Sequence, residues 1–123
     1  LLGGRCAEKI IYDNVSTGAS DDIEKISTLV HHYTMHWGMN ETLGPLNPNA
    51  MGALVETLDN KIMEQCKQIV KHIESQTMKY LTKHKSYIRE IATSLLNNET
   101  ILYSKIKEIL PQELEDSCEI LCL

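Results

Sequence analysis

The fold is decided by residues 20–38, which read SDDIEKISTLVHHYTMHWG. Apolar side chains recur in this stretch every three or four residues, which is the spacing of an amphipathic α-helix. These side chains are Ile23, Ile26, Leu29, Val30 and Tyr33. Ser20 or Asp21 can cap the start of the helix, and Asp21 followed by Glu24 fits a capping box. Gly38 can end the helix in a left-handed conformation.

The helical spacing continues on both sides of this stretch. Cys6, Ile10 and Ile11 predict a short helix that ends near residues 12–14. Further helices are expected over about residues 55–82, 85–96 and 104–110. Residues 97–98, both Asn, are expected to stop the helix before them; Ser104 is expected to cap the last helix and Pro111 to end it.

The remaining segments lack regular patterns. Residues 39–54 contain Gly and Pro at short intervals, which predicts a loop. No stretch alternates apolar and polar residues over the length of a convincing strand. We therefore expect an all-α fold, an antiparallel helical bundle of about four to five helices.

Composition narrows the range of functions. Twelve Lys and Arg are interleaved with seventeen Asp and Glu, which gives a net charge of -5. Nucleic-acid binding requires clustered basic side chains, so we expect no nucleic-acid partner. The four cysteines have no Cys-x-x-Cys spacing, which favours free thiols in a reducing compartment.

Four short motifs follow one another in the first third of the chain. They are Leu-Gly-Gly-Arg at residues 2–5, Ser-Thr-Gly-Ala-Ser-Asp-Asp at 16–22, Trp-Gly-Met-Asn-Glu at 37–41 and Leu-Gly-Pro-Leu at 43–46. In this order they resemble the peptidase domain of the FtsH family, the membrane-anchored ATP-dependent zinc metalloproteases of peptidase family M41. A looser similarity continues to Pro111, through residues 56–62 and 95–102.

The resemblance implies an ATP-dependent zinc metalloendopeptidase that degrades membrane and misfolded proteins. It also implies a homo- or hetero-hexamer, with ATP and Mg bound by an ATPase module. The location would be a mitochondrial or plastid membrane, or a bacterial inner membrane. A non-catalytic helical scaffold for ring assembly or partner binding is the alternative.

The resemblance also implies how the chain is organised. Residues 1–110 would be the C-terminal helical part of the peptidase domain, truncated upstream of Leu1, and residues 111–123 an acidic tail. The family's His-Glu-x-x-His motif does not occur in these 123 residues. We therefore expect this part alone to bind zinc weakly and to be inactive.

The resemblance assigns one metal ligand to the chain. Family members hold zinc with two His of the His-Glu-x-x-His helix and with one Asp in a Gly-Ala-Ser-Asn-Asp turn. Residues 18–22, Gly-Ala-Ser-Asp-Asp, place Asp22 on that Asp. Catalytic zinc takes three protein ligands and keeps one open position, and a carboxylate suits it. The alternative is that Asp21 and Asp22 only cap a helix and complement its dipole.

Three histidines have a spacing similar to that of a metal-binding motif. His32 and His36 are four residues apart, with His31 beside them, but Tyr33 stands where a metalloprotease needs Glu as general base. We expect a surface or partly buried structural role, with an independent metal-binding bundle as the alternative. Two packing expectations concern other residues: Arg5 or Glu8 can form a buried pair, and Trp37 is expected in the core.

Overall fold

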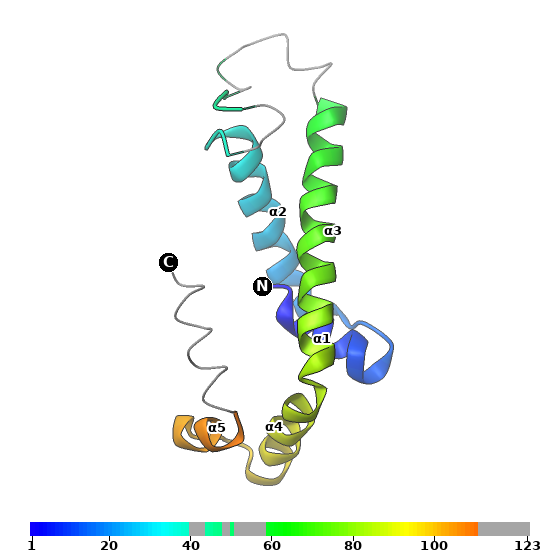
Figure 1. Cartoon of the computed structure of the whole chain (residues 1–123), viewed down its shortest axis with the longest axis vertical. Helices are drawn as coiled ribbons and strands as arrows, with labels where there is room; N and C mark the ends of the chain where they lie inside the picture. The colour runs from blue at the N-terminus through cyan, green and yellow to red at the C-terminus, as the bar shows by residue number, and fades with distance from the viewer. Residues whose placement is uncertain (40–43, 48–49, 51–58, 111–123) are drawn as a thin grey trace. The chain divides into compact units, whose positions relative to one another are not determined.

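The computed structural model describes residues 1–39, 44–47, 50 and 59–110 (Figure 1). Within these ranges the chain forms five α-helices and one short 3-10 helix, and no strand. The elements are α1 (Gly3–Tyr12), η1 (Thr17–Ala19), α2 (Ser20–Met35), α3 (Asp59–Lys83), α4 (Lys85–Asn98) and α5 (Tyr103–Ile109). The predicted all-α fold is confirmed.

The chain divides into two compact units, Leu1–Tyr80 and Leu81–Leu123. The first contains α1, η1, α2 and most of α3. Asp22 and the three neighbouring histidines, His31, His32 and His36, lie in this unit. The second contains the last residues of α3 together with α4 and α5. The predicted tail, residues 111–123, lies outside the described residues.

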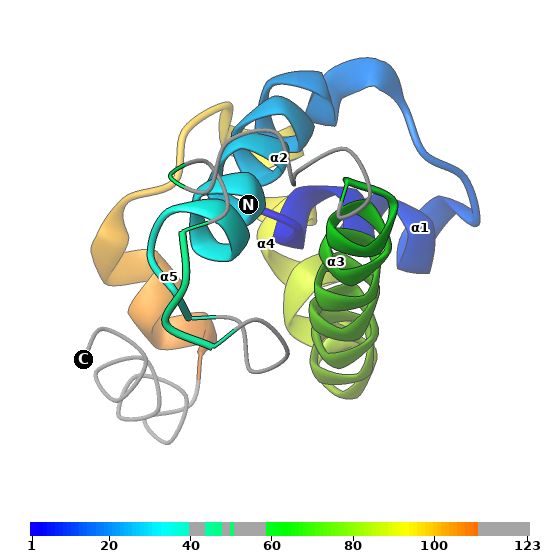
Figure 2. The same cartoon turned by 90° about the horizontal axis from the view of Figure 1, so that it is seen from above.

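In the first unit, α2 and α3 run in opposite directions (Figure 1), and the view from above shows α2 tilted relative to α3 (Figure 2). They touch at Thr34, which is fully buried and whose Oγ1 lies 3.5 Å from Sγ of Cys66. On α1, Arg5 pairs with Glu74 of α3 at 3.9 Å. These side chains remain 32% and 29% exposed, so the prediction of a buried pair at Arg5 is wrong. Such a pair contributes at most about 1 kcal/mol.

The apolar core is small. In the first unit its buried members are Cys6, Ala19, Val30, Met35 and Ile62. Trp37 is 50% exposed, so the prediction that it packs in the core is wrong. The turn after α2 is closed by backbone instead, since a Cβ built on Gly38 would lie 2.9 Å from Cα of Pro45. The backbone of Pro45 thus approaches Gly38 too closely for a side chain at that position.

The start of α2 differs from the prediction. Ala19 is the N-cap residue and no side chain caps the helix, so the predicted capping roles of Ser20 and Asp21 are wrong. The reason is the 3-10 turn η1, which leads directly into α2 and already engages Ser20, whose hydroxyl donates to the carbonyl of Thr17 at 2.5 Å. Asp21 therefore lies within the first helical turn.

Other helix ends are shifted by one to three residues. Gly38 is left-handed as expected, with φ of 62°, but α2 ends earlier, at Met35. The helix α4 continues through Asn98 and ends at Glu99, whose φ is 58°. Leu102 precedes α5, so Ser104 lies inside that helix and the prediction that it caps is wrong. The first residues predicted for the long helix, 55–58, and Pro111 lie outside the described residues.

Cys6 and Cys66 are free thiols, as predicted. The other two cysteines, Cys118 and Cys122, lie outside the described residues. Burial raises the pKa of the Cys6 thiol, which keeps it protonated and unreactive. Among the described helices, none combines the length and the apolar character that crossing a membrane requires.

Candidate functional site

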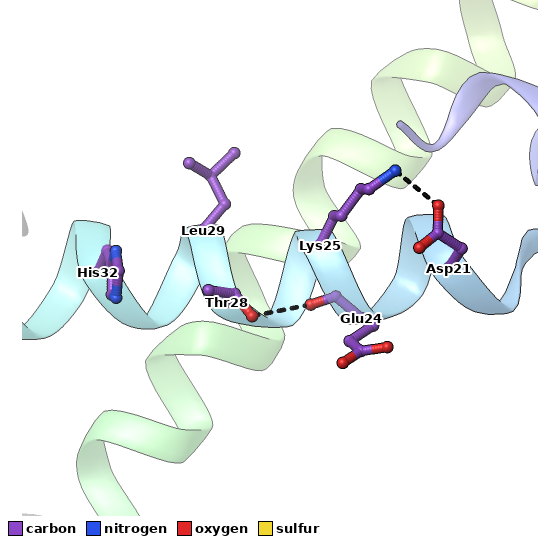
Figure 3. A pocket seen from close by; sticks show the side chains of 6 residues that line it. All are labelled: Asp21, Glu24, Lys25, Thr28, Leu29 and His32. Carbon is purple, nitrogen blue, oxygen red and sulfur yellow. Dashed lines mark hydrogen bonds and ion pairs between the residues drawn. The ribbon is translucent and has the colours of Figure 1, made fainter.

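Asp21 and Asp22 both lie in the first turn of α2, but their side chains differ. The side chain of Asp21 is 76% exposed, and its Oδ2 accepts a hydrogen bond from Nζ of Lys25 at 2.5 Å (Figure 3). Asp22 is half-buried and makes no hydrogen bond or ion pair within the described part of the chain. Its carboxylate oxygens thus remain available to a ligand such as the zinc ion that the family resemblance implies.

The loop before Asp22 is held by α1. The carboxylate of Glu8 accepts hydrogen bonds from the backbone N–H of Ser16 at 2.9 Å and from its hydroxyl at 2.7 Å. The same hydroxyl oxygen accepts a hydrogen bond from the backbone N–H of Gly18 at 3.1 Å, which caps η1. Because η1 leads directly into α2, Glu8 and Ser16 set where the first turn of α2 begins.

Sequence reasoning missed this role of Glu8 and Ser16. A local signal was present, since Ser two residues before Gly is a common turn pattern in which the hydroxyl binds the backbone. The partner of the hydroxyl is eight residues away on another helix, so it could not be inferred from that pattern.

The hydrogen bonds from Ser16, the backbone N–H first and the hydroxyl second, lower the pKa of Glu8. A carboxyl whose pKa is lower in the folded state stabilises the fold above its unfolded pKa of about 4.3. That contribution disappears as the pH falls through the folded pKa. We expect Glu8→Gln to lower the melting temperature at pH 7 and to have little effect at pH 3, as measured by circular dichroism.

Glu24→Gln is the control for Glu8→Gln, since the side chain of Glu24 has no hydrogen-bond partner in the described residues. It should leave the melting temperature unchanged at both pH values. A Glu8→Gln effect of equal size at pH 7 and pH 3 would contradict the assigned role of the ionised carboxylate.

A surface hollow of about 400 Å³ follows one side of α2 (Figure 3). Its lining residues are Asp21, Glu24, Lys25, Thr28, Leu29 and His32. All of them belong to this one helix, and Asp22 is not among them. The hollow is therefore part of the helix surface rather than a substrate cleft around the candidate metal ligand.

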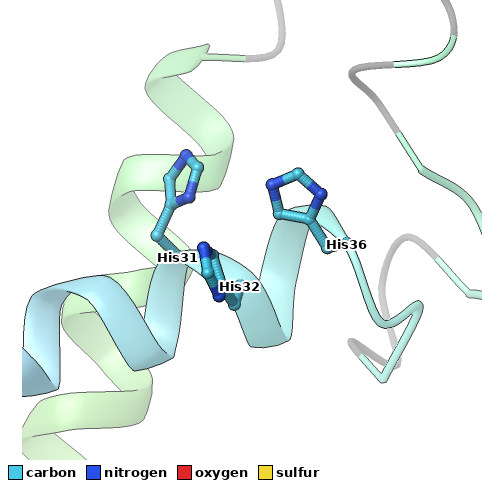
Figure 4. Close-up of side chains that lie close together, drawn as sticks. All are labelled: His31, His32 and His36. Atoms are coloured by element: carbon cyan, nitrogen blue, oxygen red, sulfur yellow. The ribbon is translucent and has the colours of Figure 1, made fainter.

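His31, His32 and His36 are exposed and lie together at the C-terminal end of α2 (Figure 4). Their potential ligand nitrogen atoms all lie within 4.8 Å of one another. His31, the nearest of them to Asp22, is nine residues farther along α2, a rise of about 14 Å. The three histidines therefore cannot complete the coordination of an ion held by Asp22.

Comparison with known proteins agrees with the motifs. A model of peptidase family M41 matches residues 1–109 of the chain. The ATP-dependent zinc metalloprotease FtsH of Marinobacter nauticus is 33% identical, over 91% of this chain and 20% of its own length. FtsH of Chlorobium luteolum is 34% identical, over 99% of this chain and 19% of its own length.

A eukaryotic relative gives the same result. The mitochondrial inner membrane m-AAA protease component yta12 of Schizosaccharomyces pombe is 31% identical, over 89% of this chain and 15% of its own length. The chain thus spans a fifth or less of the length of these curated relatives. Because the family model covers nearly all of its residues, the chain belongs to peptidase family M41.

Proposed function

We propose that this chain is part of an ATP-dependent zinc metalloendopeptidase and that Asp22 is one of its zinc ligands. Membership of family M41 and the names of the relatives support the activity. The observation that carries the role of Asp22 is its contrast with Asp21: one carboxylate is paired with Lys25, and its neighbour has no partner in the described residues. When bound, zinc supplies Lewis-acid catalysis of peptide-bond hydrolysis.

The residues of this chain would orient the site rather than complete it. Asp22 would contribute one anionic ligand from the first turn of α2, and Glu8 and Ser16 would fix that turn through η1. Two histidine ligands and the general base would come from the family's His-Glu-x-x-His motif, which these 123 residues do not contain.

The finer features of the proposal concern the whole enzyme. The substrates would be membrane and misfolded polypeptides, the assembly a homo- or hetero-hexamer, and ATP and Mg would bind a separate ATPase module. The location would be a mitochondrial or plastid membrane, or a bacterial inner membrane. Two names support the ATP dependence and the membrane location: the FtsH proteins are called ATP-dependent, and yta12 is called a mitochondrial inner membrane component.

A second candidate is a helical scaffold that assembles a ring or binds a partner without cleaving. Large apolar side chains exposed on the second unit favour it, among them Leu96 at 85% and Leu102 at 72% exposure. A His-Glu-x-x-His motif in the parent gene, encoded upstream of this segment, would decide for the protease. Its absence there would decide for the scaffold.

The chain of 123 residues should not hydrolyse casein on its own, because catalytic zinc takes three protein ligands and Asp22 supplies one. The measurement is release of labelled peptides from casein at saturating zinc, with and without a chelator. The intact protease is the positive control. Hydrolysis by the isolated chain that a chelator abolishes would contradict the proposal that two of the three zinc ligands lie outside these 123 residues.

A further inference from the structure

We propose that His31, His32 and His36 form a second metal site, which binds one divalent transition-metal ion, zinc foremost, independently of Asp22. The three imidazoles come from the last two turns of α2 and its C-cap residue, and all are exposed (Figure 4). The inference does not depend on the proposed protease function, because none of the three residues takes part in it.

The geometry permits coordination with small movements. Ring centroids lie 5.1 Å apart for His32 and His36, 5.9 Å for His31 and His36, and 6.1 Å for His31 and His32. Tetrahedral zinc with bonds of about 2.0–2.1 Å to nitrogen places its ligand atoms about 3.4 Å apart. The potential ligand atoms here lie within 4.8 Å of one another. Side-chain rotations that move these atoms by roughly an ångström would bring them to the distances that zinc requires.

The backbone makes such a rotation easy to achieve without loss of structure. His32 and His36 are four residues apart, on one face of a helix, where side chains meet. The backbone N–H of His36 donates to the carbonyl of His32 at 2.9 Å, which fixes the distance between the two Cα atoms. Exposed rings on a fixed backbone can turn toward a common ion.

Charge and ligand chemistry also favour a cation here. The C-terminal end of a helix carries the negative end of its dipole, which stabilises a nearby cation. Neutral imidazole nitrogen is a preferred ligand of zinc, copper and nickel. Three protein ligands leave a position open to water, so this is an exposed, exchangeable site rather than a closed structural one.

An ion bound here would cross-link the C-terminal end of α2 to the segment that follows it. His31 and His32 belong to the last turns, whereas His36 is the C-cap residue from which the chain leaves toward Gly38. Coordination by all three would tie the exit segment to the helix. Zinc should therefore raise the melting temperature of the protein, since a ligand that binds only the folded state stabilises it.

The lone tryptophan provides the readout. Trp37 is the single Trp of the chain, and its ring centroid lies 6.2 Å from that of His32. Co²⁺ is paramagnetic and quenches a nearby indole. Titration of the untagged 123-residue chain with Co²⁺ should quench Trp37 fluorescence with a stoichiometry of one ion per chain, and Zn²⁺ should displace the Co²⁺ and restore the signal.

Two substitutions test two of the three ligands. His32→Ala and His36→Ala should each weaken Co²⁺ and Zn²⁺ binding by about tenfold or more, as loss of a ligand costs at least as much as loss of an outer-shell partner. His72→Ala is the matched control, since His72 is an exposed helical histidine on α3 outside the cluster. His72→Ala should bind as the unsubstituted chain does, and Asp22→Asn should retain the Co²⁺ quenching of Trp37, because Asp22 lies about 14 Å or more along α2 from the three histidines.

His32, His36 and His72 are exposed, so circular dichroism should show unchanged helix content in their variants. Saturable quenching that His32→Ala and His36→Ala weaken, together with a zinc-dependent rise in melting temperature, would support the site. Three results would overturn it: no saturable quenching, quenching unchanged in the double variant His32→Ala/His36→Ala, or an equal loss in Asp22→Asn.

Discussion

Replacing Asp22 by Asn in the intact protease should reduce proteolysis by at least about tenfold and leave ATP hydrolysis unchanged. Asn has the same shape as Asp and stays in the first turn of α2, where Asp22 caps nothing and pairs with no described residue. The substitution removes the anionic oxygen that zinc requires and little else. The measurements are casein hydrolysis, ATPase rate and zinc content of the purified enzyme.

The adjacent residue is the control. Asp21→Asn removes an exposed ion pair with Lys25, which contributes about 0.3–0.5 kcal/mol, and it should leave proteolysis and zinc content unchanged. If both variants lose proteolysis equally, the effect comes from the helix start and not from a ligand. Full zinc content and full activity in Asp22→Asn would likewise contradict the assignment.

The second large effect is on stability. Gly38→Ala should lower the free energy of unfolding by about 2–4 kcal/mol, because a left-handed backbone costs an L-residue about 1–2 kcal/mol and an overpacked contact costs a similar amount. Gly38 has φ of 62°, and its added Cβ would lie 2.9 Å from Cα and 3.3 Å from the carbonyl carbon of Pro45. Backbone atoms cannot rotate away, so the turn itself must shift. Urea denaturation followed by circular dichroism measures the change.

Gly44→Ala separates the two causes. Gly44 is also left-handed, with φ of 66°, but no heavy atom of the described structure lies within 4 Å of an added Cβ. This variant should lose only the conformational part, about 1–2 kcal/mol. Equal losses at Gly38 and Gly44 would mean that the contact with Pro45 contributes nothing.

The helices could be predicted because their signal is local. Apolar residues at three- and four-residue spacing fixed α2 and α4 to within a few residues. The starts of the helices could not be predicted in this way, because they depend on competing hydrogen bonds. At α2, the hydroxyl of Ser20 donates to the carbonyl of Thr17 in η1, and Asp21 does not cap the helix. The burial of Trp37 could not be predicted either, because burial depends on tertiary contacts that local spacing does not contain, and the indole is 50% exposed.

The candidate site could be predicted from the sequence only in part. The family motif pointed to Asp22, and the structure adds what the motif does not contain, the brace from Glu8 across eight residues to Ser16. The spacing of His32 and His36 was visible in the sequence. The convergence of His31 with them was not, because it depends on side-chain directions at the end of α2.

The central claim is that Asp22 binds zinc, and anomalous diffraction at the zinc absorption edge tests it most directly. Crystals of the intact peptidase domain should give an anomalous peak about 2.0–2.2 Å from a carboxylate oxygen of Asp22, with two histidines of a His-Glu-x-x-His helix completing the protein ligands. A catalytic zinc peak held by other residues, with the carboxylate of Asp22 outside bonding distance, would contradict the account.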